Sequence, residues 1–224
     1  MMHYTLTRSK RKTVAIYIRD GHVEVRAPYR TNKRDIERFI MSKEKWIAEK
    51  LANSNELADS RERFTLDYGS RLTYRGVQYP IEPVPGGRAG FDGNRFYMPP
   101  GLEPERIKAV SVQTYRRLAK IYIIGRTRLL ARSMTVNPSK IRITSARTRW
   151  GSCSANKNVN FSWRLVMASD AVIEYVIIHE LAHLIEMNHS ERFWRIVENA
   201  LPNYRERKKQ LNILQEKLNA ENWE

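Results

Sequence analysis

Residues 176–185 read VIIHELAHLI, and this stretch decides both the fold and the chemistry that we expect. His179 and His183 are four residues apart, so on a helix both imidazoles project from one face, one turn apart. Neutral imidazoles at that separation can occupy two corners of a zinc tetrahedron. Glu180 lies about 100° round the helix from His179, where it can serve as general base towards a water on the metal.

The His-Glu-x-x-His pattern is specific. With five His in 224 residues, chance alone predicts about 0.01 occurrences. The neighbouring residues are apolar nearly all round, which predicts a buried helix over residues 170–187. Ionisable groups in such a helix are costly unless they are paired or bind a metal. Two core histidines with satisfied hydrogen bonds are the alternative interpretation.

A third zinc ligand must come from outside this pair. On a continuous helix His189 would face away from the metal, because six residues beyond His183 correspond to about 240° past a full turn. A break at Asn188 would return His189 to the metal, and Ser190 would then cap a new helix. We favour His189, since imidazole is a common zinc ligand. The competing candidates are Glu186, Glu191 and Glu198.

The chain is strongly basic, with a formal net charge of +16. Residues 101–150 contribute most of this excess, with twelve Lys or Arg against two Glu. Anionic partners are therefore expected, among them nucleic acid, nucleotides and acidic protein surfaces. Cys153 is the single cysteine, which excludes an internal disulfide and a zinc site built from cysteines. No signal peptide and no membrane span is apparent, so we expect a cytoplasmic protein.

The pattern of elements indicates an α+β fold. Residues 1–100 form a β-rich region with one helix over 32–52, a hairpin at 74–77 and further short strands. Ten of the 22 residues from 80 to 101 are Pro or Gly, which predicts a boundary or a long loop. A long helix should start at Pro104, with Ile107, Ile121 and Leu129 in its buried stripe. Strands around a turn at 150–152 should follow, then helices at 170–187, from Ser190, and over 203–219.

The sequence around these residues resembles a known family, the YgjP-like metallopeptidases of the zincin type. The resemblance starts from HELAH together with NHS at 188–190 and FW at 193–194. It extends to four further segments, RSKRKT (8–13), VRAP (25–28), RWGSCS (149–154) and NFSWRLVMA (160–168). It implies an N-terminal β-rich part, residues 1–100, followed by a zincin-like helical catalytic part with a small sheet, residues 101–224, within one continuous domain. It also implies zinc binding by His179, His183 and His189, with Glu180 as the base.

Three arginines flank the WGSCS segment and are candidates for substrate binding. Arg147, Arg149 and Arg164 could hold a carboxylate or phosphate through two hydrogen bonds, or could be solvated. Cys153 is a weaker candidate for a nucleophile, because its surroundings describe a tight turn packed by an indole.

The function that we expect is a zinc-dependent hydrolase with one Zn²⁺ per chain, in first place a metallopeptidase that acts on a polypeptide. Two alternatives remain open. One is a metal-dependent hydrolase of nucleotides or other phosphoanhydrides, and the other is a nucleic-acid-associated protein that docks through the basic helix.

Overall fold

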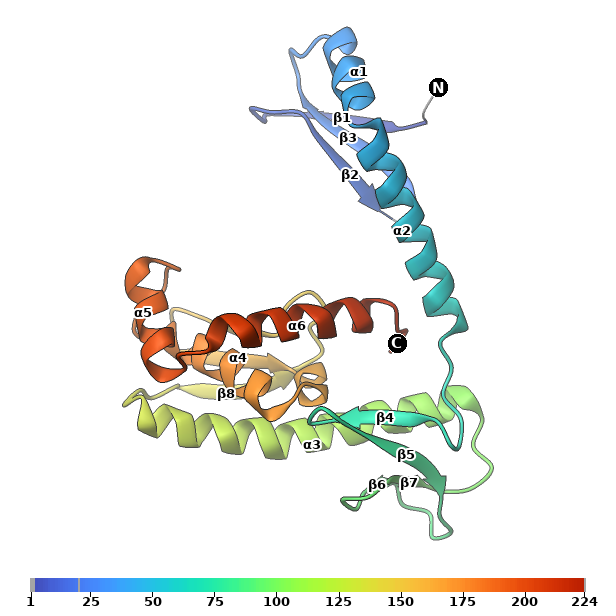
Figure 1. Ribbon diagram of the computed structural model, residues 1–224, viewed down its shortest axis with the longest axis vertical. Helices are drawn as coiled ribbons and strands as arrows, with labels where there is room; N and C mark the ends of the chain where they lie inside the picture. Colours follow the sequence, from blue (N-terminus) through green and yellow to red (C-terminus); the bar gives the residue numbers. More distant parts are fainter. Residues whose placement is uncertain (1–2, 20, 224) are drawn as a thin grey trace. The chain divides into compact units, whose positions relative to one another are not determined.

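The computed structural model describes residues 3–19 and 21–223, and its fold is α+β (Figure 1). The chain divides into two compact units. The first comprises residues 1–64 with 218–222, and the second comprises residues 65–217 with the C-terminal 223–224. Among the described residues no helix is both long and apolar enough to cross a membrane.

The first unit is a three-stranded sheet with two helices. Its strand order is β1-β3-β2, with β1 parallel and β2 antiparallel to β3. Every second residue of β3 points into the core, where Val23, Val25 and Ala27 meet Ile36 and Ile40 of the first helix. The elements are β1 (Thr5–Ser9), β2 (Ala15–Arg19), β3 (His22–Pro28), α1 (Lys33–Ser42) and α2 (Glu44–Arg63).

The single helix predicted over 32–52 is two helices in the structure. Asn32 caps the first, because its side chain accepts a hydrogen bond from the Arg34 amide at 3.1 Å. The break falls at Lys43, whose amide bonds to the carbonyl of Ile40, three residues back, at 3.0 Å. This tight closing turn ends α1, and Ile47 of α2 still reaches the same core.

The second unit opens with a four-stranded sheet of order β4-β5-β7-β6. The hairpin predicted at 74–77 is present, with Arg75 and Gly76 at φ angles of 52° and 80°. The Pro/Gly-rich residues 80–101 lie inside this unit and hold short strands in place of one long loop. The strands are β4 (Arg71–Tyr74), β5 (Val77–Pro83), β6 (Gly90–Phe91) and β7 (Phe96–Met98).

Helix α3 (Pro104–Ser133) starts at the predicted Pro104 and buries Ile107 as predicted, but the rest of its buried face differs from the prediction. Ile121 and Leu129 are 74% and 55% exposed. The helix instead buries a row of mostly small or hydroxyl residues that lets neighbouring elements approach closely, and the hydroxyls of Ser111 and Thr127 bond to carbonyls four residues back. The buried row is Ile107, Ser111, Tyr115, Ala119, Ile123, Thr127 and Ala131.

The core of the second unit is aromatic around this helix. Tyr115 stacks on Trp163 with ring centroids 5.7 Å apart, and its hydroxyl donates to the carbonyl of Thr73 at 2.8 Å. Phe96 of β7 and Trp223 near the end of the chain also contact the Tyr115 ring. The helix is thereby joined to the hairpin, to the short helix η1 (Trp163–Met167) and to the end of the chain.

A second sheet of three strands lies against α3 and carries the WGSCS segment. Its order is β8-β10-β9, for β8 (Lys140–Thr144), β9 (Gly151–Cys153) and β10 (Asn158–Ser162), with β10 parallel to β8 and antiparallel to β9. Gly151 therefore starts a strand and does not lie in the turn predicted at 150–152. The turn falls at 154–157, where Lys157 has a φ of 57°.

Three helices follow this sheet in the chain, and the first of them packs against it (Figure 1). They are α4 (Asp170–Ala182), α5 (Glu191–Ala200) and α6 (Tyr204–Asn219). The predicted starts of α5 and α6 are confirmed. Helix α4 packs against α3, α5 and β9, as its apolar surface predicts.

Candidate metal centre

Helix α4 places the His-Glu-x-x-His motif at its C-terminal end. His179 and Glu180 lie in its last turn, and His183 follows its last residue, still with helical angles (φ −64°, ψ −17°). The two imidazoles are one turn apart on the same side, with ring centroids 5.0 Å from each other.

The helix ends five residues before the predicted residue 187. After Ala182 the chain tightens, and the amides of Leu184 and Ile185 bond to carbonyls three residues back at 3.0 Å. The break thus precedes Asn188, but it has the effect that we expected from a break there, since the chain turns back and returns His189 to the first two histidines. Ser190 then caps α5, accepting from the Phe193 amide at 3.3 Å.

The three imidazoles converge. One ring nitrogen from each of His179, His183 and His189 lies within 4.8 Å of the others. The Nε2 atoms of His179 and His189 are 3.1 Å apart. Two nitrogens on one tetrahedral zinc are about 3.3 Å apart, given Zn–N bonds of about 2.05 Å. The His179–His189 pair therefore has the spacing of two nitrogens on one zinc ion, and the His183 nitrogen lies within 4.8 Å of both.

The protonation states also suit ligands. His183 Nδ1 donates to the Glu186 carbonyl at 3.2 Å, which leaves Nε2 for a metal. Burial, followed by the two neighbouring imidazoles, lowers the pKa of His179 to about 3, so this ring is neutral. Its Nδ1 is buried and has no hydrogen-bond partner among the residues that the structure describes. Histidines with a purely structural role in a core pair their ring nitrogens with protein groups. Here His183 Nδ1 has such a partner, whereas His179 Nδ1 has none among the described residues.

Two aromatic residues of α5 hold the imidazoles in place. Phe193 is fully buried, and its ring centroid lies 4.5 Å from His183 and 4.8 Å from His189. Trp194 stacks on His189 at 5.8 Å, with 24° between the ring planes. These contacts restrict the exposed His189 side chain, which comes from an irregular segment.

The competing third ligands are engaged elsewhere. Glu186 faces Arg192 at 3.8 Å, and Glu198 pairs with Arg205 at 3.2 Å. Glu191 lies in the first turn of α5, where an acidic side chain stabilises the helix through its interaction with the positive end of the helix dipole. Within the described part of the chain, the three histidines are the group of side chains that could together hold a metal ion.

Glu180 is buried beside the histidines and against β9. It is 6% exposed, and this burial raises the pKa of its carboxyl group to about 7. Arg149 acts in the opposite sense and lowers the pKa. A Cβ atom added at Gly151 would come within 2.6–2.8 Å of the Glu180 side chain. Gly151 is therefore the residue that lets β9 pass close to the carboxylate. The sequence analysis missed this role because it placed Gly151 in a turn, whereas a glycine inside a strand signals such a close approach.

The other candidates are distributed around this core. Arg149 is near Glu180, whereas Arg164 lies over the Trp163 ring and donates to the Ser145 carbonyl at 3.3 Å. Arg147 is exposed between β8 and β9. Burial, and then Glu180, raise the pKa of Cys153, which disfavours its thiolate. Because the thiolate is the nucleophilic form, Cys153 is poorly suited to attack a substrate.

The comparison with protein families agrees with this arrangement. The model of the YgjP-like metallopeptidase domain matches residues 12–213, nearly the whole chain. The chain belongs to the YgjP-like metallopeptidase family. This membership assigns it to the peptidase-type hydrolases and implies a metal cofactor.

Two solved structures are similar to part of this YgjP-like chain. One is the metallopeptidase zymogen abylysin of Pyrococcus abyssi, with 23% identity over 45% of this chain and 97% of that one, and a TM-score of 0.38. The other is the metallopeptidase zymogen jannalysin of Methanocaldococcus jannaschii, with 25% identity over 43% and 96% of the two chains, and a TM-score of 0.37. No curated protein matches the chain significantly.

Proposed function

We propose that this YgjP-like protein is a zinc-dependent metallopeptidase with one zinc ion per chain, bound by His179, His183 and His189. The observation that carries the proposal is the convergence of three imidazole nitrogens next to a buried carboxylate. Three protein ligands leave one tetrahedral position open, as catalytic zinc sites require.

In this proposal each residue has a separate task. Zinc, when bound, supplies Lewis-acid polarisation of the scissile carbonyl and activates a water molecule. Glu180 accepts a proton from the attacking water and later delivers it to the leaving amine. Its raised pKa lies close to neutral pH, so the carboxyl group can both accept and release a proton under those conditions. Phe193 and Trp194 keep the imidazoles oriented.

We propose a polypeptide as the substrate. Arg149 is positioned near Glu180 and could bind a carboxylate of the substrate, whereas the stacking of Arg164 on Trp163 gives it a structural task. The single cysteine suits a reducing, cytoplasmic compartment. Hydrolysis of nucleotides by the same centre is the alternative, and the experiment must distinguish it from peptide hydrolysis.

Zinc-loaded and zinc-stripped protein, each incubated with an unfolded protein and with nucleoside triphosphates, will test this proposal. We expect the zinc-loaded form to cleave peptide bonds, the stripped form to be inactive, and the triphosphates to remain intact. Fragments would be identified by mass spectrometry, and phosphate release would be measured in parallel. Zinc-dependent release of phosphate without peptide cleavage would replace the peptidase by a phosphoanhydride hydrolase.

His189→Ala should weaken zinc binding by about 100-fold or more. Replacing a residue that only hydrogen-bonds to a zinc ligand already lowers zinc affinity by about 10–100-fold, and loss of a ligand itself should cost at least as much. The measurement is a competition titration with a chelator of known affinity. Glu191→Gln is the matched control, since Glu191 is a neighbouring candidate, and it should bind zinc like the wild type. Full affinity in His189→Ala would remove His189 from the ligand set.

A further inference from the structure

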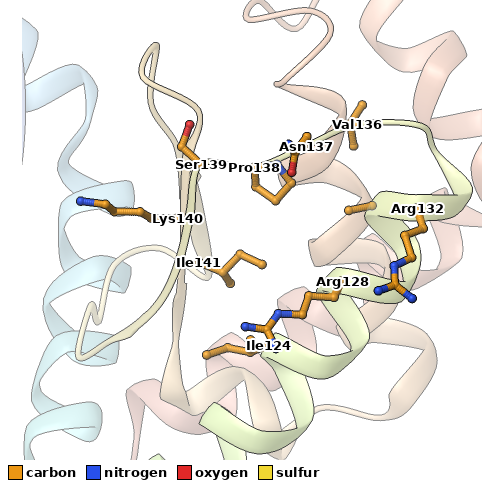
Figure 2. Close-up of a pocket in the computed structure, with 10 residues that line it drawn as sticks. Ile124, Arg128, Arg132, Val136, Asn137, Pro138, Ser139, Lys140 and Ile141 are labelled. Carbon is orange, nitrogen blue, oxygen red and sulfur yellow. The ribbon is translucent and has the colours of Figure 1, made fainter.

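A second feature of the molecule lies away from the histidines, between helix α3 and the edge strand β8. Two adjoining hollows of about 360 and 400 Å³ open there and share Ile124 and Ile141. We name their combined lining the α3–β8 groove. Figure 2 shows the first hollow, with Arg128 reaching from α3 towards the strand and Ile141 pointing into the gap. The strand's Lys140 points away from α3 in this view.

The helix side of the groove carries a stripe of positive charge. Arg116, Lys120, Arg128 and Arg132 line the groove and are all exposed. Together with Ile124 they recur every four residues, which places them along one side of α3. Like charges four residues apart on a helix repel one another, so this stripe does not favour the helix itself.

Acidic groups do not compensate this charge. Neither hollow has an Asp or Glu in its lining. Among the described residues, none of the four cations forms an ion pair with a carboxylate, although Arg126 on another side of the same helix pairs with Glu174. The acidic residues of this part of the chain lie before and in the first turn of α3. From Glu105 to Arg116 the helix rises by roughly 16 Å, about twice the Debye length at physiological salt.

The strand side of the groove adds charge and backbone donors. Lys140 and Arg142 of β8 belong to the lining. Among the strands that the structure describes, β8 pairs with β10 alone, so its outer edge presents backbone groups without a neighbouring strand. Guanidinium groups and backbone amides are the donors that proteins direct at phosphate oxygens.

We propose that the α3–β8 groove binds the phosphate backbone of double-stranded nucleic acid without reading its sequence. A duplex fits better than a single strand, because proteins that hold single strands stack the bases on aromatic rings. Neither hollow has an aromatic residue in its lining. The opposite edge strand of the sheet, β9, is the one that contacts α4. Binding in the groove therefore does not use the histidine cluster, and it does not rest on the proposed peptidase activity.

The test is a triple variant, Lys120→Gln, Arg128→Gln and Arg132→Gln, with a mixed-sequence 24-base-pair duplex as the probe. Arg116 is kept because it donates to the Ser145 hydroxyl at 2.7 Å. Since each lost phosphate contact reduces the slope of log affinity against log salt by about 0.9, we expect the slope to fall by roughly 2.7. Affinity at low salt should fall at least about tenfold. Duplexes of different sequence should bind the wild type equally.

The control variant carries Arg88→Gln, Arg195→Gln and Lys209→Gln, which remove the same charge from three exposed positions outside the groove. Circular dichroism and thermal unfolding establish that both variants are folded. The proposal is overturned if the groove variant binds the duplex like the wild type, or if the control loses as much affinity. Tighter binding of a single strand of the same length would overturn the choice of a duplex. Equal binding of polyglutamate would overturn the choice of nucleic acid.

Discussion

Glu180→Gln should bind zinc like the wild type and hydrolyse its substrate about 10²–10⁴ times more slowly, the usual contribution of a positioned general base. Glutamine keeps the shape of the side chain and its packing against Gly151, but its amide cannot accept the proton of water at neutral pH. The loss should appear in kcat and kcat/KM equally, because the interaction is made only in the transition state. Zinc content and steady-state kinetics of the two proteins provide the measurement.

The substitution should not destabilise the zinc-free protein. Burial raises the pKa of Glu180 in the folded state, so the ionised carboxylate opposes folding above its unfolded pKa. A neutral glutamine removes that opposition, and the melting temperature of the variant near pH 8 should equal or exceed that of the wild type. A slow variant with normal zinc and undiminished stability separates a catalytic role from a structural one.

Glu186→Gln is the matched control for this experiment. Glu186 is a glutamate of the same segment that faces Arg192, and its replacement should leave both zinc binding and rate close to those of the wild type. The proposal for Glu180 fails if Glu180→Gln loses zinc, since the side chain would then be a ligand. It fails equally if the hydrolysis rate is retained.

The sequence was most informative where local rules decide the structure. The start of α3 follows from Pro104 at its first turn, and the start of α5 follows from the Ser190 cap. Two glutamate candidates for the third ligand could not be dismissed from the sequence, because their ion pairs with Arg192 and Arg205 form only in the folded chain.

The incorrect predictions concern places where tertiary packing outweighs periodicity. Apolar residues over 170–187 predicted one helix, yet the last turn tightens after Ala182 and brings His183 close to the buried ring of Phe193. Ile121 and Leu129 were placed in the core by their spacing, but α3 turns the row from Ile107 to Ala131 inward and leaves these two side chains exposed. Gly151 resembles a turn residue in sequence, whereas in the structure it starts β9 and its missing side chain leaves room for Glu180.

His183→Ala should abolish the stabilisation that zinc provides to the fold. A ligand that binds only the native state stabilises it by about 4.1 kcal/mol at a thousand times its Kd. For a domain of 150–250 residues, this corresponds to a rise in melting temperature of about 8–16 °C. The wild type should show that rise on zinc addition, and the variant should show almost none.

Two effects must be separated in this variant, because His183 also packs on Phe193 with ring centroids 4.5 Å apart. Loss of that contact lowers the melting temperature with or without zinc, so the relevant quantity is the zinc-dependent difference within each protein. His22→Ala, a substitution of an exposed histidine in β3, is the control and should keep the full zinc-dependent rise. If His183→Ala also kept the rise, zinc would be bound without His183. If His22→Ala lost it, the stabilising ion would lie outside the three-histidine cluster.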